Sequence, residues 1–139
     1  MSEPPISDLL LRTARTLGRA LDDALTAAGG SASTWQVLRG VRTSESGSQA
    51  ALAEVVGVRQ PTLTHHLDGL ERAGLVNRWR DPDNRRVQRV LLTPAGEELF
   101  LRLRRAAAGF EGRLTAGLED ADVTTLRRLL GTLAENGDD

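Results

Sequence analysis

The side chains of this sequence that are best suited to chemistry are arginines, and their distribution is uneven. All 18 basic residues are arginine, and seven of them lie between Arg59 and Arg89, where only four acidic residues occur. From Pro94 onward, nine acidic residues outnumber six arginines. Guanidinium groups suit bidentate contacts to phosphate and guanine, although the codon usage of a GC-rich genome would also favour arginine. This segregation, more than the net charge of -1, indicates a cationic surface in the middle of the chain.

A predicted helix within this segment has a polar face that suits contact with base edges. At 100° per residue, three leucines fall on one side of it: Leu63, Leu67 and Leu70. His65 lies on the opposite side, with Thr62 and Thr64 on the flanks, and imidazole and hydroxyl groups can donate or accept hydrogen bonds in a DNA groove. We expect His65 to contact a base, and an ordinary exposed position is the alternative. His66 lies nearer the leucines, where a structural role is favoured.

The start of this helix and of the preceding one offer further contacts to DNA. Gln60 and Thr62 lie where free backbone amides and the positive end of the helix dipole attract phosphate. Ser48 can cap the preceding helix, and Arg59 lies in the turn between the two helices. We expect all four residues to lie at a DNA interface.

An arginine-bearing hairpin follows this helix pair, with a polar tip at residues 81–86. Arg78 and Arg80 alternate with other side chains along its first strand, so they predict a cationic face beside the phosphate backbone. Arg85 and Arg86 at the tip are long enough to enter a narrow minor groove. A charge cluster on a loop can also be only a solvated turn, but the preceding helix pair favours contact with DNA.

Other classes of function find little support. The chain has no cysteine and no lysine, and no nucleophile and base are paired, so we expect no catalytic residue and no cofactor. His65 and His66 are neighbours that diverge by about 100° on a helix, which makes them poor joint metal ligands. No apolar run approaches the roughly 20 residues of a membrane span, so we expect a soluble, cytoplasmic protein. A metal sensor and a protein-interaction module that does not bind DNA remain alternatives.

Local start and stop signals predict a mainly α fold with a small β-hairpin. Gly57 and Gly74 stand where helices end, and Pro94 where one begins. The expected helices run from Ile6 to a stop at Gly29, around Trp35 to Val41, over Gln49–Val56, over Pro61–Ala73, from Pro94 to about Leu114, and over Val123–Ala134; the expected strands are Leu75–Arg80 and Val87–Leu92. Residues 136–139 are expected to fray.

Three motifs in this order resemble the MarR family of transcription regulators. They are a Leu-Glu-x-x-Gly-Leu-Val segment within Val58–Val76, an arginine-tipped turn at Asp81–Arg86, and a Leu-Thr-x-x-Gly helix start at Leu92–Gly96. The order and length of the elements match over nearly the whole chain. The resemblance implies a winged helix-turn-helix in an obligate homodimer, with the second helix of the pair in the major groove and a wing arginine in the minor groove.

The chain departs from the family at the wing. The usual Asp-x-Arg pair falls on Asn84 and Arg86, so Asn replaces the acidic brace of the arginine. An Asn oxygen can still accept a hydrogen bond from the guanidinium, and Asp83 is a second candidate for the brace. The expected DNA contacts are therefore Ser48, Arg59, Gln60, Thr62, Thr64, His65, Arg78, Arg80, Arg85 and Arg86.

Apolar stripes on the terminal helices predict dimerisation. They carry more leucines than three peripheral helices can bury alone, although a monomeric bundle is the alternative. We expect one domain over 1–139, with a DNA-binding lobe at 31–93 and a dimerisation lobe at 5–30 and 94–135. The resemblance implies a small aromatic or apolar effector, for which Trp35 is a candidate contact and a core position is the alternative. Repression of a promoter, relieved by such an effector, is the expected mechanism, and activation is the alternative.

Overall fold

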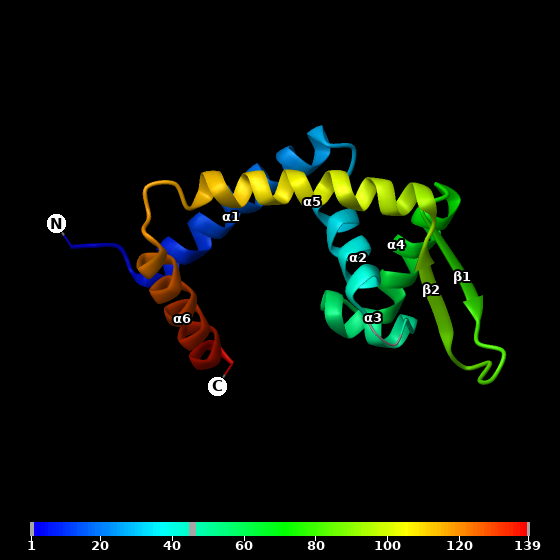
Figure 1. The fold of residues 1–139 in the computed structure, drawn as a ribbon. Coiled ribbons are helices and arrows are strands. Elements are labelled where there is room, and N and C mark those ends of the chain that lie inside the picture. The colour runs from blue at the N-terminus through cyan, green and yellow to red at the C-terminus, as the bar shows by residue number, and fades with distance from the viewer. Residues whose placement is uncertain (1, 45–46, 139) are drawn as a thin grey trace. The chain divides into compact units, whose positions relative to one another are not determined.

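A computed structural model describes residues 2–44 and 47–138, which form six helices and one antiparallel hairpin in the predicted order. The elements are α1 (Ile6–Ala27), α2 (Ala32–Thr43), α3 (Gln49–Val56), α4 (Gln60–Arg72), β1 (Val76–Arg80), β2 (Gln88–Leu92), α5 (Pro94–Leu114) and α6 (Asp120–Gly137). Figure 1 shows α2, α3 and α4 grouped beside the hairpin. The expected fold class, mainly α with a β-hairpin wing, is confirmed.

Local capping chemistry sets the ends of the central helices. The Ser48 hydroxyl accepts a hydrogen bond from the amide of Ala51 at 3.2 Å, which satisfies one free donor in the first turn of α3. Gly57 ends α3 with φ of 80°, and Gly74 follows α4 with φ of 76°, a left-handed conformation that glycine adopts without steric cost. The helix pair is therefore delimited by residues whose roles are readable from the sequence.

Helix α6 is longer than the sequence analysis predicted. It begins at Asp120 rather than Val123, because Glu119 and Asp122 form a capping box in which the Glu119 amide donates to Asp122 Oδ2 at 3.0 Å. It continues to Gly137, so the prediction of fraying from residue 136 is wrong for residues 136 and 137. Residue 139, also expected to fray, and residues 45 and 46 of the predicted polar connection lie outside the described residues.

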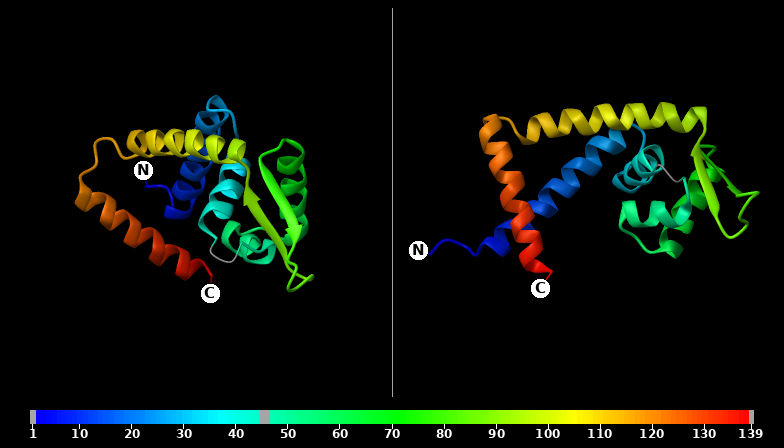
Figure 2. Two further views of the ribbon diagram at one scale, coloured as in Figure 1. Left: turned by 45° about the vertical axis from the view of Figure 1, so that its right-hand side comes forward. Right: turned by 60° about the horizontal axis from the view of Figure 1, so that its bottom comes forward.

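The hairpin pairs Val76 with Leu92 and Arg80 with Gln88, so the strands are each one residue shorter than predicted. Two further views show that its tip extends beyond the neighbouring helices α2, α3 and α4 (Figure 2). Val76 and Val90 anchor the base of the hairpin in the core, with exposed fractions of 1% and 2%. The tip is thus free to act as a wing while its base is fixed.

One compact unit spans Met1–Ala107 and contains the hydrophobic core. The core draws buried side chains from α1 to α5 and both strands, including Leu25, Leu38, Leu52, Leu63, Leu67, Val90 and Leu103. Gly40 lets α2 pass close to α3, because a Cβ there would lie 2.7 Å from Leu52 Cδ1 and 2.9 Å from Val56 Cγ2. This packing gives the helix pair and the hairpin a common rigid base.

A second unit spans Ala108–Asp139 and comprises the end of α5 together with α6. Helix α6 has no buried residue among those described, and its leucines are 41–45% exposed: Leu126, Leu129, Leu130 and Leu133. In the described part of the chain, no helix is both long and apolar enough to cross a membrane.

Candidate nucleic-acid interface

Helix α4 is divided into a buried and an exposed side, as its spacing predicted. Leu63 and Leu67 are fully buried, whereas His65 and Thr62 are exposed. Gln60 in the first turn is also exposed. No side chain among the described residues caps this helix, so its first amides and the positive end of its dipole remain available to an anion. The exposed side therefore combines polar side chains with a phosphate-attracting end.

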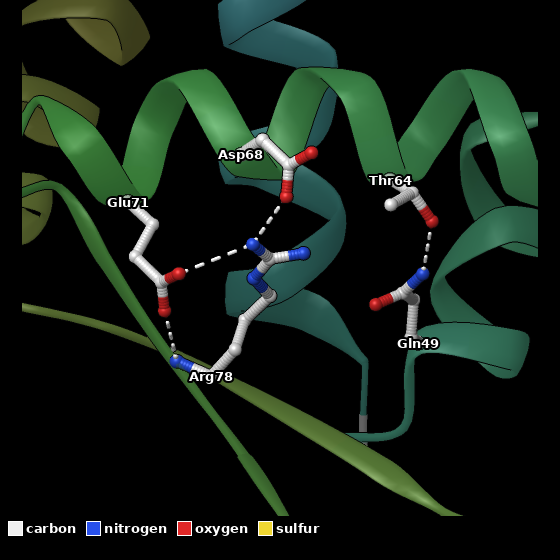
Figure 3. A network of polar contacts seen from close by, with 5 residues as sticks. All are labelled: Gln49, Thr64, Asp68, Glu71 and Arg78. Carbon is white, nitrogen blue, oxygen red and sulfur yellow. Dashed lines mark hydrogen bonds and ion pairs between the residues drawn. The ribbon is translucent and has the colours of Figure 1, made fainter.

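Thr64 is tied to the preceding helix rather than fully exposed. Its Oγ1 accepts a hydrogen bond from Gln49 Nε2 at 2.7 Å, and Thr64 is half-buried (Figure 3). This bond joins α3 to α4 and fixes the rotamer of the threonine. Sequence reasoning did not find Gln49, because residues 15 positions apart give no local signal of contact. The expected DNA contact of Thr64 stays a prediction.

Ser48 lies directly before α3, and Arg59 lies directly before α4. Ser48 is half-buried, uses its hydroxyl as the cap of α3, and forms a β-bridge with Arg89. Arg59 is exposed and takes the position before α4. Their expected DNA contacts stay predictions.

Arg78 is the residue that the structure places differently from expectation. Its guanidinium donates to Asp68 Oδ1 and, at 3.1 Å, to Glu71 Oε1, and its backbone amide donates to Glu71 Oε2 at 3.1 Å (Figure 3). The side chain is only 13% exposed. The prediction that Arg78 and Arg80 form one cationic strand face is wrong, because β1 packs against α4 and two carboxylates neutralise Arg78.

The charge state of Arg78 follows from the same contacts. Desolvation of its guanidinium lowers the pKa of Arg78, but the hydrogen bonds and charges of Asp68 and Glu71 together outweigh this, and the pKa is raised. Arg78 is therefore a permanently charged link between β1 and α4.

The tip of the wing is organised by Asp81. Its Oδ1 accepts from the Asp83 amide at 2.8 Å and its Oδ2 accepts from Arg89 Nε at 2.9 Å. These contacts, the Asp83 amide first, hold the pKa of Asp81 below its usual value. Arg80 also braces the tip, since its Nη1 donates to the carbonyl of Arg85 at 2.9 Å. The turn-forming Asp81-Pro82 pair was a sequence signal for this role, whereas the Arg89 contact had none.

The arginines at the tip are exposed. In residues 2–44 and 47–138, no hydrogen bond or ion pair engages the guanidinium of Arg85 or Arg86. Asn84 Oδ1 accepts from the backbone amide of Arg86 at 3.3 Å, so the expected brace from Asn84 to the guanidinium is not formed. Asp83 does not take its place among the described contacts. Both guanidinium groups are thus free to reach a ligand.

A pocket of about 300 Å³ lies between the start of α2 and α4, and His65, His66 and Arg72 line it together with Ser33 and Thr34. The imidazole ring centroids are 6.2 Å apart. Among the described residues, no group of three or more metal-binding side chains occurs.

Trp35 belongs to the core. Its ring is 8% exposed and stacks on Phe100 with a centroid distance of 5.5 Å, while Arg39 lies over it at 5.5 Å. The core alternative for Trp35 is therefore the one that the structure supports, and a ligand would have to displace a neighbour to reach the ring.

Comparisons with known proteins agree with this geometry. A model of the MarR family matches residues 31–87. The solved structure of the transcriptional regulator PA3341 superposes on this chain with a TM-score of 0.80. The aligned sequences are 32% identical, and the alignment covers 96% of this chain and 98% of PA3341. The M. tuberculosis regulator MOSR, solved in complex with DNA, is 27% identical, covers 97% of both chains and has a TM-score of 0.78. A mutant MarR from E. coli, solved with operator DNA, is 26% identical, covers 93% of both chains and has a TM-score of 0.82.

Proposed function

The chain belongs to the MarR family of transcription regulators, and we propose that it represses a promoter by binding a pseudo-palindromic operator as a homodimer. As a member of this family it is a DNA-binding regulator and not an enzyme. We propose that α4 and the wing contact different grooves of the operator.

The observation that carries the proposal is the pairing of an exposed polar helix with an exposed cationic wing in one compact unit. The outer side of α4 presents Thr62 and His65, whose size and polarity suit base edges in the major groove. The free guanidinium groups of Arg85 and Arg86 at the wing tip suit the negative potential of a narrow minor groove. Phosphate contacts near the start of α4 would set the register of the protein on the duplex.

Exposed apolar residues on the terminal helices support the homodimer. Ile6 and Leu11 of α1 are 60% and 58% exposed, and every leucine of α6 is exposed. Leucine side chains of this number are stabilised when a second copy covers them. The lobes proposed for this division of labour are 31–93 for DNA binding and 5–30 with 94–135 for dimerisation. A two-fold dimer would read half-sites roughly 10 base pairs apart.

We also propose that a ligand regulates DNA binding. A small aromatic or apolar effector that favours one spacing of the two α4 helices would shift the population between DNA-binding and released states. Trp35 lies in the packed core, stacked on Phe100, rather than in an open site. The protein would act in the cytoplasm, where the promoter is.

Salt dependence of binding tests the role of the wing. Arg86→Ala removes one phosphate-neutralising group per protomer, so the slope of log K against log salt should become shallower by about 0.9 per protomer, or roughly 2 per dimer. Fluorescence anisotropy on an operator duplex, identified by footprinting the promoter beside the gene, measures this slope. Arg105→Ala, which removes an exposed arginine of α5, is the matched control and should leave it unchanged. An unchanged slope for Arg86→Ala would exclude the wing contact.

Base preference tests the role of α4. His65→Ala should weaken binding to the operator more than binding to a random duplex. Contacts to bases distinguish one DNA sequence from another, whereas contacts to phosphate only orient the protein on the duplex. Equal losses on the two duplexes would contradict a base contact by His65.

A further inference from the structure

Among the described residues, the polar contacts between β1 and α4 are made by one residue of β1, Arg78. Arg78 makes three contacts to two carboxylates of α4, two through its guanidinium and one through its backbone amide. Asp68 and Glu71 are three residues apart, so they lie on neighbouring turns of one helix side and close on Arg78 together. Figure 3 shows the guanidinium directed at both carboxylates.

A second tie lies on the same side of α4. Thr64 precedes Asp68 by four residues and accepts its hydrogen bond from Gln49 of α3 (Figure 3). Helix α4 is therefore held by polar contacts to α3 near its start and to β1 near its end. The first contact orients the helix within the helix pair, and the second orients the wing against the helix.

The charges around Arg78 argue against a direct contact with phosphate. Two carboxylates face one guanidinium, so the group carries a net charge of -1, which repels a phosphate backbone. The guanidinium is 13% exposed, and its Nε is buried with no hydrogen-bond partner in the described part of the chain.

The same charges argue against a role in stability alone. The side chains of Asp68 and Glu71 are 50% and 42% exposed, and solvent screening leaves ion pairs with such exposed partners little net effect on stability. The best-attested use of such a pair is to fix one arrangement among several. Here the arrangement to be fixed is the direction of the wing.

We propose that Arg78 is a positioning residue for DNA binding, which holds β1 against Asp68 and Glu71 so that the wing and α4 enter neighbouring grooves together. The inference rests on the proposed function. At about 3.3 Å per residue, the start of the tip at Pro82 lies roughly 13 Å along the chain from Arg78, so a rotation of about 10° there moves the tip by roughly 2 Å. A displacement of that size exceeds the range over which a hydrogen bond holds.

In the double variant Asp68→Ala with Glu71→Ala, a change of charge alone would strengthen DNA binding, whereas loss of the positioning role would weaken it. This variant makes the DNA-facing surface more positive by two charges per protomer, yet the loss of both acceptors for Arg78 should weaken operator binding at least tenfold. Binding to a random duplex should change less, because non-specific binding does not need the wing and α4 in register. Arg78→Gln should show the same operator loss with an unchanged salt slope.

Asp83→Ala is the matched control. Asp83 is an exposed acid of the wing whose side chain makes none of the described contacts, so its removal adds positive charge without breaking a tie. It should leave operator binding unchanged or strengthen it. Faster hydrogen exchange of the Arg78 amide, which donates to Glu71, should accompany the loss in the double variant.

Failure of the positioning role and failure of the proposed function give different results in these experiments. If the wild-type protein fails to bind duplex DNA in a salt-dependent manner, the proposed function is wrong. If the wild-type protein binds and the double variant binds equally well or more tightly, the positioning role is wrong. A salt slope for Arg78→Gln that is shallower by about 0.9 per protomer would instead identify Arg78 as a phosphate contact. Should the double variant melt below the assay temperature, Glu71→Ala alone, which removes two of the three contacts, carries the same expectation.

Discussion

Gly96→Ala should destabilise the protein, because α5 begins where its backbone nearly touches the chain that enters β1. A Cβ on Gly96 would lie 2.0 Å from the carbonyl oxygen of Leu75, well inside the 3.0 Å that real Cβ atoms essentially never cross. The same carbonyl accepts a hydrogen bond from the Thr93 amide at 3.0 Å, and Thr93 Oγ1 donates to the Gly74 carbonyl at 2.6 Å. Helix α5 therefore cannot move away without weakening its own start.

The expected magnitude combines three effects. Overpacking costs about 1–3 kcal/mol, and weakening one hydrogen bond costs about 1 kcal/mol. The higher helix propensity of alanine offsets about 1 kcal/mol of this loss of stability. The free energy of unfolding should thus fall by about 2 kcal/mol, which for a chain of this size lowers Tm by roughly 4–8 °C.

Urea denaturation at a fixed protein concentration measures this change, since the stability of a dimer depends on concentration. Gly69→Ala is the matched control, because a Cβ there meets no atom of the described residues within 4 Å. That substitution lies inside α4 and should stabilise the protein by up to about 1 kcal/mol. Stability of Gly96→Ala equal to or above that of the wild type would mean that the start of α5 accommodates a Cβ without cost, contrary to this expectation.

Two further predictions concern polar contacts. Thr64→Val removes the acceptor of the 2.7 Å bond from Gln49, so the free energy of unfolding in urea should fall by about 1 kcal/mol; no loss would mean that water replaces the bond without cost. The lowered pKa of Asp81 means that its carboxylate stabilises the wing above its unfolded pKa, about 4, and that this contribution is lost as pH falls through the lower folded value. Protection of the Asp83 amide, corrected for intrinsic exchange, should therefore decline as the pH falls below about 4 in the wild type, and should not follow this titration in Asp81→Asn, whose side chain keeps an acceptor oxygen but does not ionise; an equal decline in both proteins would contradict this.

The order of the elements was predictable because the signals that delimit them are local. Ser48, Gly57 and Gly74 act on backbone groups a few residues away, so their roles are visible in the sequence without knowledge of the fold. The start of α6 was missed for a related reason. Glu119 is an uncommon N-cap residue, and the capping box that it forms with Asp122 was not recognised.

The exposed side of α4 was likewise predictable from the sequence. A fixed rotation per residue places His65 opposite Leu63 whatever the helix packs against, provided that the leucines face the core. The same reasoning failed for Arg78. Alternation along a strand assigns Arg78 and Arg80 to one face, but it does not say which part of that face another element covers.

The sequence by itself thus determined the helices, the hairpin and the side of α4 that faces outward, because each depends on residues close together in the chain. Only the tertiary structure decided which arginines are free. Packing of β1 on α4 brings Asp68 and Glu71 to Arg78, seven to ten positions away, and leaves Arg86 exposed at the tip. Charge neutralisation depends on distance in space, which the composition of a segment does not specify.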